Sequence, residues 1–170
     1  MEDKTIETAS AVKIIEVEMA DMQVCESPGR LITRGLGSCL GITIYDNIRK
    51  AGCMIHAMLP DMSRAKIRTN PGRFVNSSIT HMIEKLEKLG CQRSRMVAKL
   101  FGGAHMFSFI TESTINVGQN NIDMAESLFK ELGMKVIARE VGGTFGRTIE
   151  LNLENGKVLV KTASWGQKEV

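Results

Sequence analysis

The sequence contains no apolar run that approaches the roughly 20 residues needed for a membrane-spanning helix. Its first ten residues are polar and include acids, whereas an export signal would begin with a basic stretch followed by an apolar one. These two absences argue against a membrane-embedded protein and against a secreted one. We therefore expect a cytoplasmic protein with no direct membrane insertion.

Neither sign of charge is in large excess, because 22 lysines and arginines stand against 19 aspartates and glutamates. This balance argues against a protein that holds nucleic acid mainly by electrostatic attraction. Hydrophobic residues make up 43% and charged residues 24% of the 170 residues, close to the average of soluble globular proteins. The composition thus predicts one compact domain rather than a disordered or fibrous chain.

One basic cluster interrupts this balance. Arg64, Lys66, Arg68 and Arg73 lie in the segment RAKIRTNPGR, which contains no acid. The cluster lacks the interleaved aromatic side chains on which bases would stack, so nucleic acid is not the expected partner. Two interpretations remain open: a solvated loop, or a docking surface for an acidic partner.

The four cysteines do not form a pattern typical of a metal site. None belongs to a CxxC pair, and Cys53 and His56, the closest pair of possible ligands, would lie on opposite faces of a strand. Without an export signal, disulfides are not expected either. We predict no metal and no cofactor, and we interpret Cys25, Cys53 and Cys91 as structural residues.

Patterning predicts an α+β domain over residues 13–165, preceded by a flexible N-terminal segment at 1–12. Strands are expected at 15–19, 31–33, 39–45, 51–59, 96–101, 134–141, 147–153 and 157–162, with a turn at 21–29. Apolar residues spaced three and four apart predict amphipathic helices at 74–89 and 121–132, each closed by a glycine. The segment GLGS lacks the spacing of a phosphate-binding loop, so a nucleotide fold is not expected.

Cys39 is the most suggestive residue for chemistry. It follows the glycine-rich corner GLGS, where free peptide N–H groups can hold an oxyanion. A nucleophilic cysteine needs a base, and His56 lies on the next strand-like run, within possible reach through sheet pairing. The alternative is that Cys39 is a small buried apolar residue and His56 a core residue. His105, in the segment GGAHMF, is a further candidate to line the site, whereas His81 is expected on the flank of the first helix.

Several blocks together resemble a known family. They are TRGLGSC at 33–39, HAMLP at 56–60, KLFGGAHMF at 99–107, Val117-Gly118, Gly142-Gly143 and Gly146-Arg147. In this order and spacing they are similar to the CheD family of chemoreceptor glutamine deamidases. The resemblance covers about residues 15–162, and the first two blocks are its most specific parts.

The resemblance implies packed mixed β-sheets flanked by helices, similar to the catalytic domain of cytotoxic necrotizing factors. It also implies a catalytic triad in which Cys39 is the nucleophile, His56 the base and Thr33 the residue that orients His56. Such enzymes convert glutamine side chains of methyl-accepting chemotaxis receptors to glutamate, and members bind the phosphatase CheC. For the oxyanion we expect backbone groups of the corner formed by Gly37, Ser38 and Cys39.

Two other functions remain open. The same thiol could hydrolyse receptor methyl esters, or the fold could serve as a non-catalytic adaptor that binds receptor or CheC. The sequence also departs from the family pattern at two places: Asn120 replaces an arginine, and Phe74 a tyrosine. We therefore transfer no role to the position of Asn120.

Overall fold

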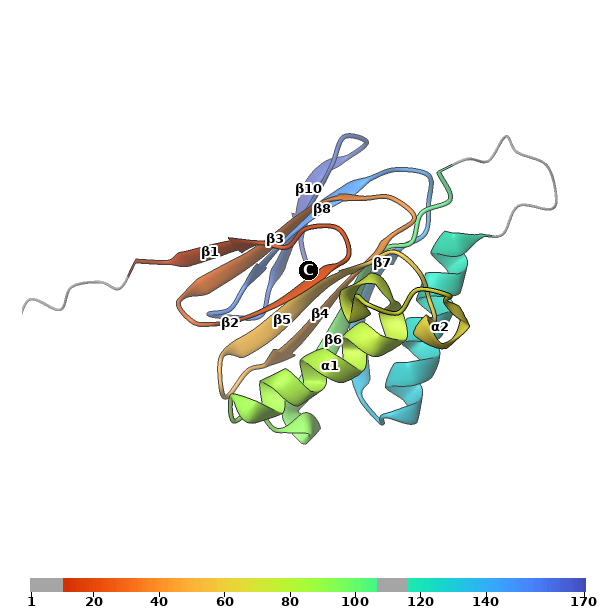
Figure 1. The fold of residues 1–170 in the computed structure, drawn as a ribbon. Helices are drawn as coiled ribbons and strands as arrows, with labels where there is room; N and C mark the ends of the chain where they lie inside the picture. Colours follow the sequence, from red (N-terminus) through yellow and green to blue (C-terminus); the bar gives the residue numbers. More distant parts are fainter. Residues whose placement is uncertain (1–10, 107–115) are drawn as a thin grey trace, which may run out of the picture.

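The computed structural model describes residues 11–106 and 116–170, so most of the predicted flexible segment 1–12 lies outside the described residues. Within them, ten strands form two five-stranded mixed sheets (Figure 1). In sheet order, the first contains β1 (Lys13–Glu16), β3 (Gly29–Leu36), β8 (Arg147–Asn152), β9 (Val158–Thr162) and β10 (Gly166–Glu169). The second contains β2 (Asp21–Glu26), β5 (Ala51–Ala57), β4 (Leu40–Asp46), β6 (Met96–Gly102) and β7 (Lys135–Val141).

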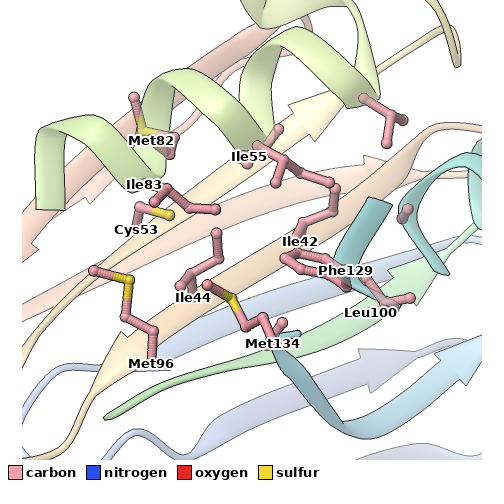
Figure 2. Close-up of a cluster of buried hydrophobic side chains, with 14 of the residues drawn as sticks. Ile42, Ile44, Cys53, Ile55, Met82, Ile83, Met96, Leu100, Phe129 and Met134 are labelled. Atoms are coloured by element: carbon pink, nitrogen blue, oxygen red, sulfur yellow. The ribbon is translucent and has the colours of Figure 1, made fainter. Parts of the chain in front are cut away.

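Strands β4 and β5 lie inside the second sheet and are buried along their whole length. Their side chains alternate between two cores because successive residues of a strand point to opposite faces. Ile42, Ile44 and Ile55 pack toward the helices, as Figure 2 shows, together with Phe129 and Met82. The opposite face of the same strands packs against the first sheet, in a separate apolar cluster. The arrangement is a three-layer stack of sheet, sheet and helices.

Two helices cover the outer face of the second sheet (Figure 1). Helix α1 (Val75–Lys88) buries residues three and four apart, among them Ile79, Met82 and Ile83. Helix α2 (Val117–Glu131) begins four residues earlier than expected, because the Asn116 side chain caps the free N–H of Gln119. Within the described ranges, three short 3₁₀ helices lie in the connections, at Met62–Arg64, Pro71–Arg73 and Arg93–Arg95.

The expected α+β class, with packed mixed sheets flanked by helices, is confirmed. The expectation of a turn throughout 21–29 is wrong, because β2 occupies Asp21–Glu26 and pairs with β5 over its full length. The first strand lies at Lys13–Glu16 rather than at 15–19, and it pairs in parallel with β3. None of the helices in the described ranges combines the length and apolar character needed to cross a bilayer.

Candidate functional site

Thr33 and His56 meet between the two sheets. Thr33 points inward from β3 and His56 inward from β5, with exposures of 0% and 1%. The Thr33 hydroxyl oxygen lies 2.7 Å from Nδ1 of His56 and 2.6 Å from the backbone carbonyl oxygen of Val17. Of the predicted site residues, these two are joined by a direct hydrogen bond.

The second contact determines which ring nitrogen of His56 carries the proton. A hydroxyl has one hydrogen, and the Val17 carbonyl can only accept one. The Thr33 hydroxyl therefore donates to Val17 and accepts the N–H of His56 Nδ1. In the neutral ring this leaves a free lone pair on Nε2, which is the form required of a base.

The second ring nitrogen of His56, Nε2, is the one that remains to act as a base. Nε2 is buried, and it has no hydrogen-bond partner within the described residues. Burial lowers the pKa of His56 below its ordinary value of 6.5, because the charged imidazolium loses its solvation. At neutral pH the ring is uncharged and able to accept a proton.

Cys39 lies on the connection between β3 and β4, one residue before the first residue of β4. In the ladder between β4 and β5, Gly41 is opposite His56. The next pair along, Leu40 with Ala57, brings Cys39 to the end of this ladder, and the Cys39 side chain packs against the intersheet cluster, on the same side of the second sheet as His56. Gly41, which faces His56, carries no side chain, and a Cβ at this position would lie 2.6 Å from Cδ1 of Leu36.

The Cys39 thiol differs from the other three in its surroundings. It is partly exposed, whereas Cys25, Cys53 and Cys91 are buried. Burial raises the pKa of the Cys39 thiol above its ordinary value, and burial raises that of Cys53 to about 12. Both members of the candidate pair, Cys39 and His56, are therefore neutral at rest near pH 7.

The backbone of the cysteine loop is held from one side. The carbonyl oxygens of Gly37 and Cys39 accept the N–H groups of Ala104 and Gly103, each at 2.8 Å. A side chain could not replace Gly102 in this contact, because a Cβ would lie 2.5 Å from the Cys39 oxygen and φ is +87°. In residues 11–106 and 116–170, no backbone carbonyl accepts the amide N–H of Ser38 or of Cys39, and the Cys39 N–H lies against the thiol of the same residue.

The remaining candidates lie around this centre. His105 is half-buried beyond Ala104, and its amide bonds the Gly143 carbonyl at 2.8 Å. His81 is half-buried on α1, and Asn120 is exposed on α2. The described part of the chain contains no group of three or more His, Cys, Asp or Glu residues that could hold a metal ion.

Sequence reasoning missed two residues of this centre. Val17 contributes a backbone carbonyl, which no side-chain pattern can reveal. Asn121 is fully buried on α2 and bonds the Ser38 carbonyl through its side-chain amide. It directly follows Asn120, the residue of the block at 117–121 that departs from the family pattern. The available signal was its spacing along the helix, which places it on the same face as Ala125.

Known proteins of one family are similar to most of this chain. The family described as CheD chemotactic sensory transduction matches residues 58–162. A relative from Desulforamulus reducens is 40% identical over 92% of this chain and 95% of its own, and one from Clostridium tetani is 42% identical over 94% and 97%. Both are named "Probable chemoreceptor glutamine deamidase CheD".

A solved structure has a similar fold. The crystal structure of a Neisseria meningitidis protein of the family DUF152 aligns with a TM-score of 0.50 and 10% sequence identity. The alignment covers 79% of this chain and 65% of that protein, so the chain spans slightly less than two thirds of its length. At this identity the likeness concerns the fold alone.

Proposed function

This chain belongs to the CheD family, and from that premise we propose that it hydrolyses glutamine side-chain amides in methyl-accepting chemotaxis receptors. The observation that carries the proposal is the hydrogen-bonded pair of Thr33 and His56, which leaves Nε2 free as a base. In this proposal Cys39 is the nucleophile, His56 the general base and Thr33 the residue that orients His56.

In the first half-reaction, His56 Nε2 accepts the thiol proton as Cys39 Sγ attacks the amide carbon of the glutamine side chain. The carbonyl oxygen becomes an oxyanion, and we assign its stabilisation to the backbone amides of Ser38 and Cys39. The imidazolium then donates its proton to the departing nitrogen. The carbon–nitrogen bond breaks, ammonia leaves, and a thioester joins Cys39 to the receptor.

In the second half-reaction, neutral His56 accepts a proton from water, and the hydroxide attacks the thioester carbon. The carbon–sulfur bond breaks, and the imidazolium returns its proton to the sulfur. A glutamic acid side chain and the original thiol result, and the new carboxyl loses its proton to the solvent. Each proton transfer that makes or breaks a bond to carbon passes through Nε2, so the reaction as proposed needs no metal and no cofactor.

We also propose the finer expectations that follow from the resemblance. The substrate is the cytoplasmic methylatable region of the receptor, and the protein works in the cytoplasm. The phosphatase CheC is a second partner, and a pull-down with purified CheC tests that contact independently of catalysis.

The central test uses a receptor cytoplasmic fragment as substrate and mass spectrometry as the readout for each glutamine. Cys39→Ala and His56→Ala should abolish conversion to glutamate while leaving the folded structure intact. Cys53→Ala is the matched control, because this buried thiol faces the helices rather than the site, and it should remain active. Full activity in Cys39→Ala would refute the mechanism.

The same experiment separates the competing functions. A methylated receptor fragment that releases methanol with no conversion of glutamine would identify a methylesterase. Binding of the fragment by the wild-type protein with neither product would identify an adaptor. Ammonia released in step with new glutamate residues identifies the deamidase.

A further inference from the structure

The Asn121 side chain links helix α2 to the backbone of the candidate site. Its side-chain Nδ2 donates to two backbone carbonyl oxygens, those of Ser38 and Met58, each at 3.1 Å. Ser38 precedes Cys39, and Met58 lies two residues after His56. One buried amide thus joins the loop that carries the candidate nucleophile to the segment that follows the candidate base.

The orientation of this amide is determined by its neighbours. Both partners are carbonyl oxygens, which only accept, so the NH₂ group and not the oxygen of Asn121 must face them. The remaining atom, Oδ1, is buried and has no partner within the described residues. An unpaired buried oxygen is unfavourable for stability, so it offsets part of what the two hydrogen bonds contribute.

The consequence for the loop follows from the geometry of the peptide bond. In a trans peptide, the carbonyl of Ser38 and the N–H of Cys39 point in opposite directions. The Ser38 carbonyl points toward α2, on the helix-covered face of the second sheet. The Cys39 N–H therefore points away from α2, toward the intersheet side where the Cys39 side chain packs.

We propose that Asn121 is a positioning residue that orients the Cys39 amide as an oxyanion donor. The close approach of α2 that this needs is present, because Gly118, one turn earlier, touches the backbone of the Gly103–Ala104 loop. A Cβ at Gly118 would lie 2.5 Å from the Gly103 carbonyl oxygen. This inference deepens the proposed function, yet it concerns any reaction at Cys39 that forms an oxyanion.

The test compares two reactions of Cys39 that differ in this respect. Acylation by p-nitrophenyl acetate passes through an oxyanion, whereas alkylation by iodoacetamide displaces iodide and forms none. Removing an oxyanion donor outright costs about 10²–10³ in rate, so a misdirected donor in Asn121→Ala should slow acylation by about 10- to 100-fold. Alkylation should stay within about twofold of wild type, since the thiol and His56 are unchanged.

Ser78→Ala is the matched control for lost stability. Ser78 is also fully buried on a helix, α1, and its hydroxyl donates to the Pro71 carbonyl at 3.0 Å. This variant should keep the wild-type ratio of acylation to alkylation even where its melting temperature falls. Asn121→Asp, which keeps the shape but presents an oxygen to the two carbonyls, should lower the ratio at least as far as Asn121→Ala.

An unchanged ratio in Asn121→Ala, or an equal loss of both reactions, would overturn the inference. The second result would mean that Asn121 supports the thiol itself and not the amide. Failure of the proposed function gives a different result, in which wild-type protein acylates normally at Cys39 but leaves receptor glutamines unchanged.

Discussion

The hydroxyl oxygen of Thr33, on β3, lies 2.7 Å from Nδ1 of His56, on β5 of the opposite sheet. Because its hydrogen is directed at the Val17 carbonyl, this oxygen acts as an acceptor for the ring. The orientation of the imidazole therefore depends on a side-chain oxygen, and it depends on the two sheets keeping their spacing.

Replacing Thr33 with valine, which has nearly the same shape, should therefore impair catalysis. The ring would lose the acceptor that holds Nδ1–H, and a misplaced general base costs turnover by about 10² or more. Thr33→Ser keeps an oxygen at the same position and should restore most of the rate. Steady-state kcat on a receptor fragment measures both. Equal rates in wild type and Thr33→Val would remove the Thr33 side chain from the proposed set.

The pH dependence should report a neutral pair rather than an ion pair. Burial raises the pKa of the Cys39 thiol and lowers that of His56, so both groups are uncharged between these two values. When the pH falls through the lowered pKa of His56, Nε2 is protonated and can no longer accept the thiol proton. The acid limb of kcat/KM should therefore lie below pH 6.5, the ordinary value for histidine.

Alkylation of Cys39 by iodoacetamide checks the other group of the pair. Its rate should keep rising as the pH increases beyond 9.0, the ordinary thiol value, because only the thiolate reacts. A rate that is already constant across neutral pH would contradict this expectation, since it would indicate a preformed thiolate and imidazolium. Cys39→Ala corrects for slow reaction at the buried cysteines.

The parts of the fold that could be predicted are those that bury apolar side chains. The apolar run at 39–45 predicts a strand and is β4, which is buried on both faces. The spacing at 74–89 predicts a helix and is α1, which packs one apolar face against the second sheet. Strand β10 gave no such signal. All four of its residues are exposed, and it is held by backbone pairing with β9.

The candidate site also has one part that the sequence predicts and one part that it does not. Cys39, His56 and Thr33 could be named because their types and their sequence blocks suggest chemistry. The tautomer of His56 could not, since it depends on the carbonyl of Val17, which reaches the site only when β1 pairs with β3. Asn121 was hidden for a related reason: its partners are backbone groups 83 and 63 residues away.

Asp46, at the end of β4, should make stability depend on acid pH. Burial by itself would raise the pKa of this carboxyl, but bonds from Arg95 and three backbone N–H groups outweigh burial and lower the pKa from 3.8 to about 2. The charged form is thus favoured by folding, which contributes about 2 kcal/mol at neutral pH. This contribution is complete above the unfolded value near 3.8 and disappears as the pH falls through about 2.

Urea unfolding of wild type and Asp46→Asn at pH 7, 4 and 2 tests this linkage. The variant should be less stable at pH 7, because Arg95 loses its partner at 2.7 Å. The difference in the free energy of unfolding should shrink at pH 2, where the wild-type carboxyl is also becoming neutral. A difference that is constant across this range would show that Asp46 acts through shape and hydrogen bonding alone.

The basic cluster should speed the encounter with an acidic receptor surface. The backbone carbonyl of Arg73 accepts the N–H groups of Met58 and Leu59, so the cluster adjoins the segment after His56. Arg64, Lys66 and Arg73 are exposed, and the Arg64 side chain is 88% accessible. Arg68 is excluded from the test, because its guanidinium bonds the backbone of its own loop.

Replacing Arg64, Lys66 and Arg73 with glutamine should lower kcat/KM on intact receptor by about three- to tenfold at low salt and leave kcat unchanged, since exposed charges act mainly on association. The loss should vanish at high salt, where charges are screened beyond about 3 Å at 1 M. A short neutral glutamine peptide should react as it does with wild type.

The matched control neutralises Lys50, Lys85 and Lys88, which are also exposed. Lys85 and Lys88 lie in the last turn of α1, at the end of the helix away from the cluster. If both triple variants lose the same efficiency on receptor, net charge alone is responsible and the loop is a solvated surface.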